Sequence, residues 1–448
     1  MKSAYKNLFH IEPAVGLLND PNGLIQFKGK YYFFHQWNRF ETTHDYKEWG
    51  LFTSSDLLDW QAHGSAVLPD QVNDKDGIYS GSAVEKDGQL YLFYTGNSKE
   101  EDQRKSRQRI AYSKDGRTFI KSDTVIETPL GLTEHHRDPK VWAHDGKWWM
   151  IVGAQTENNE GAISLFESGN LIDWTYQGLF FTDPLLEQMC ECPDTFHLAE
   201  GVDLLLVCPQ KRTPVTEDDL ALGSYSGYLV GKIDYQNKKF LPKEAQSLQL
   251  LDQGFDFYAP QSFIDEKGRR ILVAWMSRMT DEEEQQCPTI EEGYVHCLTL
   301  PRELKWQENR LYQVPLEEYQ QLRKKQAAYH QQSAVIKNSQ PIYELLVKFD
   351  NQTAPFTLTF NAGGNQLRYQ EGQLEISRIN WVSGENEMKK FAIDQLTSLQ
   401  IFNDGSAVEV FINEGQYVFS MRNFCNYSTR DITYENLGHN GSIMFYTY

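Results

Sequence analysis

The sequence predicts an all-β protein, namely a five-bladed β-propeller followed by a C-terminal β-sandwich. A pattern of two apolar runs joined at a Gly recurs five times, at intervals of 55 to 67 residues. A repeat of that length built only of strands is typical of a propeller with one four-stranded sheet per repeat. After about residue 341 the pattern changes to short alternating strands with tight turns, which favours a sandwich. An aromatic content of 13% also favours strands.

Each of the five repeats begins with a polar motif and continues with an extended run, a Gly and a second apolar run. The Gly positions are Gly29, Gly88, Gly146, Gly201 and Gly268. Apolar runs joined through Lys-Gly or Asp-Gly turns predict β-hairpins. A further element recurs in three repeats, at residues 55–60, 113–119 and 168–174. We therefore expect one blade from each repeat.

The repeat stops after residue 302, and the chain then passes through a linker. Leu316, Tyr319 and Leu322 lie at helical spacing, which predicts a short helix over residues 315–326. Further strands are predicted at residues 343–349, 356–360, 374–379, 399–402, 407–412 and 417–421. We expect the catalytic propeller over residues 1–305, the linker over 306–335 and the sandwich over 336–448.

The 448-residue chain carries a net charge of −19, which argues against nucleic acid or an anionic membrane as a partner. No run of about 18 apolar residues predicts a transmembrane helix, and the first residues lack the apolar stretch of a secretory signal. The six Cys show no dense disulfide pattern and suit a reducing compartment. We expect a cytoplasmic protein, and the sequence leaves open whether it forms a homo-oligomer.

The polar motif of the first repeat, Asp20-Pro21-Asn22-Gly23, is on its own typical of a turn. The equivalent places in the other repeats hold Ser80, Asp138, Glu191 and Tyr258. The first strand of each propeller blade lines the central axis, so residues that begin these strands converge. Polar side chains at one place in five repeats therefore predict a shared site.

Glu191 stands among small and weakly polar neighbours, and the repeat places other carboxylates near it. Both conditions raise the pKa of a carboxyl group, which would suit a general acid. A buried structural Glu is one alternative. A soft metal site formed by Cys190, Cys192 and Cys208 is another, although no further Cys or His lies at ligand spacing.

Asp138 directly follows Arg137, and such a pair is most often an ordinary ion pair. In the expected channel, a fixed carboxylate could instead bind sugar hydroxyls. The His residues at positions 35, 44, 135 and 136 show no metal-ligand spacing. The chain has no phosphate-binding Gly-rich loop and no nucleophilic Ser or Cys motif.

Four motifs together resemble the signature blocks of family 32 glycoside hydrolases, the β-fructofuranosidases. They are Asn19-Asp20-Pro21-Asn22-Gly23, Tyr79-Ser80-Gly81-Ser82, Arg137-Asp138-Pro139 and Glu191-Cys192-Pro193-Asp194. Their order and spacing match the family throughout. Segments at residues 257–261, 274–276, 300–302 and 404–411 resemble further family segments. The resemblance covers nearly the whole chain, and it is closest to bacterial members that act on sucrose 6-phosphate.

The resemblance implies retaining hydrolysis by a propeller with a C-terminal sandwich and without a metal or organic cofactor. It implies that Asp20 is the nucleophile, Asp138 the transition-state stabiliser and Glu191 the acid/base. It also implies substrate contacts by Leu17, Leu18, Asn19, Gln36, Trp49, Tyr79, Ser80, Arg137, Tyr258 and Trp275. One departure is that Leu51 stands where many relatives have a His after Trp-Gly.

We therefore expect a β-fructofuranosidase whose partner is a small sugar, sucrose 6-phosphate or sucrose. An exo-acting fructan hydrolase for inulin or levan is the alternative within the family, and a non-catalytic binding propeller is the alternative from another class. Because the net charge opposes an anionic ligand, a phosphate would need a local basic cluster. Arg39 and Lys47 are the first candidates for that cluster, and Lys211 and Arg212 are the second.

Overall fold

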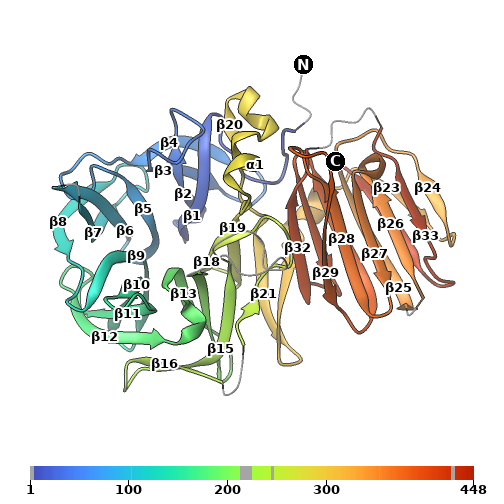
Figure 1. The fold of residues 1–448 in the computed structure, drawn as a ribbon. Helices are drawn as coiled ribbons and strands as arrows, with labels where there is room; N and C mark the ends of the chain where they lie inside the picture. Colours follow the sequence, from blue (N-terminus) through green and yellow to red (C-terminus); the bar gives the residue numbers. More distant parts are fainter. Residues whose placement is uncertain (1–4, 102, 212–224, 244–246, 353, 425–428) are drawn as a thin grey trace. The chain divides into compact units, whose positions relative to one another are not determined.

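The computed structural model describes residues 5–101, 103–211, 225–243, 247–352, 354–424 and 429–448 (Figure 1). The chain divides into two compact units. The first unit comprises Val15–Leu251 and Tyr258–Trp275, and the second comprises Met1–Ala14, Asp252–Phe257 and Met276–Tyr448. Strands dominate both units, so the predicted all-β class is confirmed.

The first unit contains four antiparallel meanders and one hairpin, which follow one another along the chain. The first meander has β1 (Gly16–Phe27), β2 (Lys30–Asn38), β3 (Glu48–Ser54) and β4 (Gln61–Val67). The second has β5 (Ile78–Lys86), β6 (Gln89–Glu100), β7 (Gln103–Ser113) and β8 (Ile120–Ile126). The third has β9 (Leu132–His144), β10 (Lys147–Thr156), β11 (Gly161–Ser168) and β12 (Thr175–Thr182).

The fourth meander follows a short 3₁₀ helix, η1 (Pro184–Leu186). It has β13 (Met189–Ala199), β14 (Val202–Gln210), β15 (Gly227–Asp234) and β16 (Lys239–Pro242), with β17 (Gln249–Leu250) also paired to β15. The hairpin consists of β18 (Tyr258–Ile264) and β19 (Arg270–Trp275).

The five predicted hairpins are confirmed, because the first two strands of each repeat pair across the predicted Gly. These five Gly residues have φ between +72° and +80°. Lys28, Asp87 and Asp145, which precede three of them, also have positive φ. Two consecutive residues with positive φ mark the type I′ turn, whose twist matches that of the flanking strands.

The first strands of the five repeats form a closed ring. β1, β5, β9, β13 and β18 contact one another in that order, and β18 contacts β1 again (Figure 1). Apolar side chains pack neighbouring meanders together outside this ring. Phe34, Trp49 and Tyr94 share one cluster between the first and second meanders, and Phe93 and Met150 share another between the second and third.

Each strand of this ring has a β-bulge at its polar motif. The ladder register slips between Leu18 and Pro21, Ile78 and Gly81, Arg137 and Lys140, Glu191 and Asp194, and Tyr258 and Gln261. A bulge breaks the regular alternation of side chains and can aim a chosen side chain in a new direction. Asp138 and Cys192 lie in the left-handed region, with φ of 72° and 45°. The bulges therefore determine where the motif side chains point.

The second unit has two six-stranded antiparallel sheets, which are ordered β23-β34-β25-β30-β31-β32 and β24-β33-β26-β27-β28-β29. The first sheet contains β23 (Lys325–Tyr329), β25 (Ile342–Gln352), β30 (Leu396–Asp404), β31 (Ala407–Ile412), β32 (Tyr417–Arg422) and β34 (Ser442–Thr447). The second contains β24 (Ala334–Ile336), β26 (Phe356–Phe360), β27 (Asn365–Gln370), β28 (Gln373–Ile379), β29 (Asn386–Ala392) and β33 (Ile432–Glu435). One apolar core contains side chains from both sheets, for example Tyr343, Phe419, Leu358 and Ile376.

Several short elements complete the second unit. They are α1 (Asp281–Gln285), η2 (Pro288–Glu292), β20 (Tyr294–Val295), β21 (Arg302–Gln307), β22 (Arg310–Pro315), η3 (Glu317–Leu322) and η4 (Asn361–Gly363). The predicted helix over residues 315–326 is correct in place but too long, because only η3 forms and β23 then begins at Lys325 to pair with β34. No helix among the described residues is long and apolar enough to cross a membrane.

Candidate active site

The motif residues of four first strands meet directly. Ser80 Oγ donates a hydrogen bond to Asp20 Oδ2, which joins β5 to β1. Cys192 on β13 lies between two carboxylates, with its Sγ 3.9 Å from Asp20 Oδ2 and 3.5 Å from Asp138 Oδ2. The backbone N–H of Cys192 donates to the same Asp138 oxygen at 2.9 Å. The predicted convergence of these motifs, which lie far apart in the sequence, is therefore confirmed.

Glu191 is held by side chains from two other first strands. Arg137 on β9 donates to Glu191 Oε1 from Nε at 3.1 Å and from Nη2 at 2.8 Å. Tyr258 on β18 donates its hydroxyl to Glu191 Oε2 at 2.5 Å. The Glu191 side chain keeps 19% of its surface exposed, whereas Arg137 keeps 8%. The carboxyl group is thus fixed at both oxygens and still reachable from solvent.

Polar side chains of the first meander surround Asp20. Asn19 donates from Nδ2 to Asp20 Oδ1 at 3.2 Å and also to Gln36 Oε1. Lys47 Nζ lies 3.4 Å from Asn19 Oδ1, and its charge opposes the rise that burial causes in the pKa of Asp20. These contacts orient the Asp20 carboxylate and leave it partly exposed.

The pKa of Glu191 differs from the sequence-based expectation. Burial does raise it, but the charge of Arg137 and the hydrogen bonds from Tyr258 and Arg137 together hold the pKa of Glu191 below its ordinary value. Donors that stabilise the ionised form outweigh desolvation here. The expectation of a raised pKa is wrong for this arrangement, because sequence alone does not show that Arg137 reaches across to Glu191.

The other two carboxyl groups have raised pKa values. Burial raises the pKa of Asp138 to about 7; Arg137 opposes this shift, and the charges of Glu191 and Asp20 add to it. Burial also raises the pKa of Asp20, although Ser80 and Lys47 oppose it. Because neighbouring carboxylates repel one another, the group takes up a proton more readily than isolated carboxylates do.

The other predicted contacts fall into two groups. Asn19, Ser80, Arg137 and Tyr258 contact the carboxylates, Gln36 accepts from Asn19, and the Tyr79 ring lies under the Arg104 guanidinium. Leu17, Leu18 and Trp49 have no exposed surface. Trp49 Nε1 donates to the Tyr79 carbonyl at 3.0 Å, so Trp49 supports the site from behind. Substrate contacts by these three residues stay a prediction, and their side chains pack behind the site in this structure.

Trp275 pairs with Tyr258 across the β18–β19 ladder and is almost buried. Trp275, Tyr258 and Ala259 form a small apolar cluster with Cys192 and Cys208. Burial raises the pKa of the thiols of Cys190, Cys192 and Cys208. Because the thiolate is the form that binds soft metals, these protonated Cys residues do not favour the metal-site alternative.

Two residues that support Asp138 escaped the sequence analysis. The Asp138 backbone N–H donates to Thr95 Oγ1 at 2.9 Å, and Thr95 donates to Gln108 Oε1 at 2.6 Å. Gln108 in turn donates from Nε2 to the His136 carbonyl at 3.1 Å. Thr95 and Gln108 face each other on β6 and β7. The sequence does not show the register in which β6 and β7 pair, so it could not reveal that Thr95 and Gln108 support Asp138.

The basic residues predicted to bind a phosphate lie in different surroundings. Arg39 donates from Nη1 to Ser65 Oγ at 2.6 Å, and its Nε lies 3.7 Å from Glu48 Oε2. Lys47 Nζ lies 3.1 Å from His44 Nδ1, beside Asn19. Lys211 Nζ lies over the Tyr225 ring, 5.1 Å from its centroid. Arg212 lies outside the described residues.

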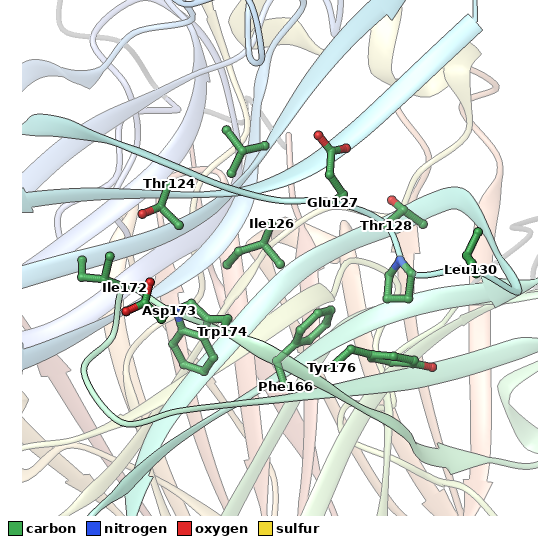
Figure 2. Close-up of a pocket in the computed structure, with 12 residues that line it drawn as sticks. Thr124, Ile126, Glu127, Thr128, Leu130, Phe166, Ile172, Asp173, Trp174 and Tyr176 are labelled. Atoms are coloured by element: carbon green, nitrogen blue, oxygen red, sulfur yellow. The ribbon is translucent and has the colours of Figure 1, made fainter.

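A separate cavity of about 650 Å³ lies between β8 and the β11–β12 ladder (Figure 2). Its lining includes Ile126, Leu130, Phe166, Trp174 and Tyr176. None of the predicted site residues lines this cavity. The carboxylate site at the strand ring is therefore a different place.

A ring of β-strands that brings three carboxyl groups together, one of them flanked by a Tyr and an Arg, is the kind of site that glycoside hydrolases use. The chain belongs to glycosyl hydrolases family 32. The model of the family's N-terminal domain matches residues 10–315, and the model of its C-terminal domain matches residues 317–444. The nearly all-β structure agrees with the family fold of a β-propeller joined to a β-sandwich.

Several known proteins are similar over almost the whole chain. A sucrose-6-phosphate hydrolase from Bacillus subtilis (strain 168) is 40% identical over 434 residues, which cover 94% of this chain and 89% of that protein. A sucrose-6-phosphate hydrolase from Klebsiella pneumoniae is 38% identical over 427 residues, covering 94% and 88%. The solved structure of a sucrose-6-phosphate hydrolase from Lactobacillus gasseri has a TM-score of 0.90 at 29% identity and covers 100% of this chain and 93% of that chain. A Bombyx mori β-fructofuranosidase variant solved with sucrose has a TM-score of 0.84 at 28% identity, covering 99% and 94%.

Proposed function

We propose that this glycoside hydrolase cleaves the terminal β-D-fructofuranosyl bond of sucrose 6-phosphate and of sucrose, with retention of configuration. The observation that carries the proposal is the cluster of Asp20, Asp138 and Glu191 in a family 32 strand ring. The names of the similar proteins support the choice of these sugars. No observation favours the fructan alternative.

In the proposed first step, Asp20 attacks the anomeric carbon of the fructosyl unit. The bond from that carbon to the glycosidic oxygen breaks, and Glu191 gives its proton to the departing oxygen. The product is a covalent ester between fructose and Asp20. Ser80 and Asn19 support this role, because their hydrogen bonds orient the Asp20 oxygens for attack.

In the proposed second step, water attacks the same carbon. Glu191, now ionised, takes a proton from that water, and the ester oxygen returns to Asp20 as a carboxylate. Asp138 binds fructosyl hydroxyls throughout. Thr95 fixes the backbone N–H of Asp138, and the Cys192 backbone N–H fixes one of its carboxyl oxygens. These fixed contacts support the proposal that Asp138 positions the sugar and does not transfer a proton.

The acid step needs a proton on Glu191, although Arg137 and Tyr258 favour its ionised form. We infer that substrate binding changes this balance. A sugar hydroxyl that accepts from Arg137 loosens the ion pair, and burial then raises the pKa of Glu191. The raised pKa of the neighbouring Asp138, about 7, supports an exchangeable proton in the site near neutral pH.

We further propose that residues 1–305 form a catalytic domain built around a five-bladed propeller, followed by the linker at 306–335 and the sandwich at 336–448. The closed ring of five first strands supports this number of blades. We also propose a cytoplasmic location. The five described Cys residues are free thiols, which suits a reducing compartment.

The proposal is tested by assaying the purified chain for released hexose with sucrose, sucrose 6-phosphate and inulin. We expect turnover of the first two, and loss of that turnover in Asp20→Asn. A chain that hydrolyses inulin faster than both small sugars would be a fructan hydrolase. A chain inactive on all three would contradict the proposed function.

A further inference from the structure

Arg104 on β7 lacks an ion-pair partner among the described residues. Its Nε donates to Asn97 Oδ1 at 3.1 Å, and its guanidinium lies over the Tyr79 ring, 5.3 Å from the centroid. The other cations of this strand end behave differently. Lys105 pairs with Glu134 at 2.9 Å, and Arg107 pairs with two exposed carboxylates, Glu100 and Glu127. The positive charge of Arg104 is thus not offset by a described carboxylate.

His135 connects Arg104 to the candidate active site. Its Nδ1 lies 3.4 Å from Arg104 Nη1 and 3.4 Å from Arg137 Nη1. Since both guanidinium groups only donate, Nδ1 accepts and the ring proton lies on Nε2. Burial, Arg137 and Arg104 all lower the pKa of His135, which agrees with a neutral ring that still has a donor to offer.

These side chains form a chain of contacts that begins at Glu191 and runs through Arg137 and His135 to Arg104. Arg137 is buried against Glu191, Arg104 is half-buried and His135 is exposed. Arg137 has Glu191 as its carboxylate partner, so the group Arg104, His135 and Arg137 has one surplus positive charge. In a chain of net charge −19, such a surplus next to a polar site is well placed to bind an anion.

The contact of this chain with Glu191 indicates which part of a substrate would meet it. Glu191 protonates the oxygen that leaves with the glucosyl unit, so that unit lies on the Glu191 side. Lys47 instead contacts Asn19, next to Asp20, where the fructosyl unit is attacked. Arg39 has its charge partly offset by the buried Glu48.

We propose that Arg104 and His135 bind the phosphate of a phosphorylated glucosyl leaving group. This inference rests on the proposed function and replaces Arg39 and Lys47 as the site of phosphate recognition. The Arg104 guanidinium supplies paired N–H donors of the geometry that suits a phosphate, and it packs over the Tyr79 ring. His135 Nε2–H adds a further donor.

The test compares Arg104→Gln with the matched control Lys105→Gln, which removes the same charge from the next residue of the strand. A charge-assisted hydrogen-bond pair corresponds to about a 10- to 100-fold change in binding. We expect the ratio of kcat/KM for sucrose 6-phosphate to that for sucrose to fall about 10- to 100-fold in Arg104→Gln, mainly through KM. The ratio should stay near the wild-type value in Lys105→Gln. Inhibition by glucose 6-phosphate should weaken in parallel.

An unchanged ratio in Arg104→Gln, or an equal fall in Lys105→Gln, would overturn the inference and leave the proposed function intact. A selective fall in Lys47→Gln alone would overturn it as well. If the wild-type chain hydrolysed neither sugar, the proposed function would fail on its own. Calorimetric binding of glucose 6-phosphate to the wild type and to Arg104→Gln would then decide the phosphate site, with weaker binding by the variant supporting it and equal or absent binding overturning it.

Discussion

Replacing Glu191 with Gln removes the proposed acid while preserving the shape of its surroundings. The amide oxygen can still accept from Arg137, as Glu191 Oε1 does at 2.8 Å. The amide NH₂ then faces the Tyr258 hydroxyl, which becomes the acceptor in place of the donor. The variant therefore keeps partners on both sides, and we expect a loss of only about 1 kcal/mol in the free energy of unfolding.

The expected effect on catalysis is much larger. General acid catalysis contributes about 10²- to 10⁴-fold, which is about 3 to 5 kcal/mol of barrier. The departing oxygen of sucrose needs a proton, so kcat for sucrose should fall by that factor. A fructosyl fluoride needs little protonation of its leaving group, so we expect its first step to slow less than about tenfold.

The assay measures kcat for both substrates in Glu191→Gln and in Asp20→Asn, with circular dichroism as the check on folding. Asp20→Asn should abolish both activities, because both substrates need the nucleophile. Equal losses for sucrose and the fluoride in a folded Glu191→Gln would refute the acid assignment.

Three further predictions concern the same carboxyl groups. Tyr258→Phe removes a hydrogen bond that lowers the pKa of Glu191, so the alkaline limb of the pH profile of kcat/KM should move to higher pH. If the limb stays where it is, the Tyr258 hydrogen bond does not lower the pKa of Glu191. Asp138 has a raised pKa of about 7 against an ordinary value of 3.8, so its contribution to stability is present below about pH 4 and is lost as the pH rises through about 7. As the pH rises between these values, the free energy of unfolding of Asp138→Asn should therefore increase relative to that of the wild type by up to about 4 kcal/mol, as measured by urea unfolding. A difference between the two proteins that does not change with pH would be inconsistent with that pKa. A crystal structure with bound sugar should place the carboxyl groups of Asp20 and Glu191 about 5–5.5 Å apart, and a separation of about 8 Å would contradict direct attack by Asp20.

The repeat, its hairpins and the meeting of the motif residues were predictable from the sequence. Each repeat has a Gly at the same position, in a hairpin turn that needs positive φ there. Gly adopts positive φ without strain, so this residue marks the turn in the sequence. Strand pattern and repeat length then place Asp20, Ser80 and Asp138 at the same point of successive first strands. These are local properties that the chain carries in each segment.

The contacts that tune the site were not predictable, because they depend on register and reach across strands. The bulges at Asp138 and Cys192 decide where those side chains point, and no residue type marks them unambiguously. The lowered pKa of Glu191 follows from Arg137 on another strand. Burial of Trp49 follows from packing against Phe34 and Tyr94.

The second unit shows the same division between local and long-range information. Six strands of the two sheets were predicted, namely β25, β26, β28, β30, β31 and β32, and six were missed, namely β23, β24, β27, β29, β33 and β34. β29, for example, lies at a sheet edge, and its sequence Asn-Glu-Met-Lys-Lys-Phe-Ala has few apolar residues. The short η3 was predicted as a longer helix, since Lys325 and the residues after it have no local signal against a helix. Pairing with β34 decides their conformation.

The central claim is that Asp20 forms a covalent bond to fructose. It is tested most directly by incubating Glu191→Gln with fructosyl fluoride, quenching in acid and sequencing the proteolytic peptides by mass spectrometry. In this variant the second step lacks its base, so the ester should accumulate. We predict one fructosyl group on the peptide that contains Asp20, attached at Asp20. It should be absent from the double variant that combines Glu191→Gln with Asp20→Asn. Attachment at another residue, or turnover without any adduct and with inverted configuration of the released fructose, would contradict the claim.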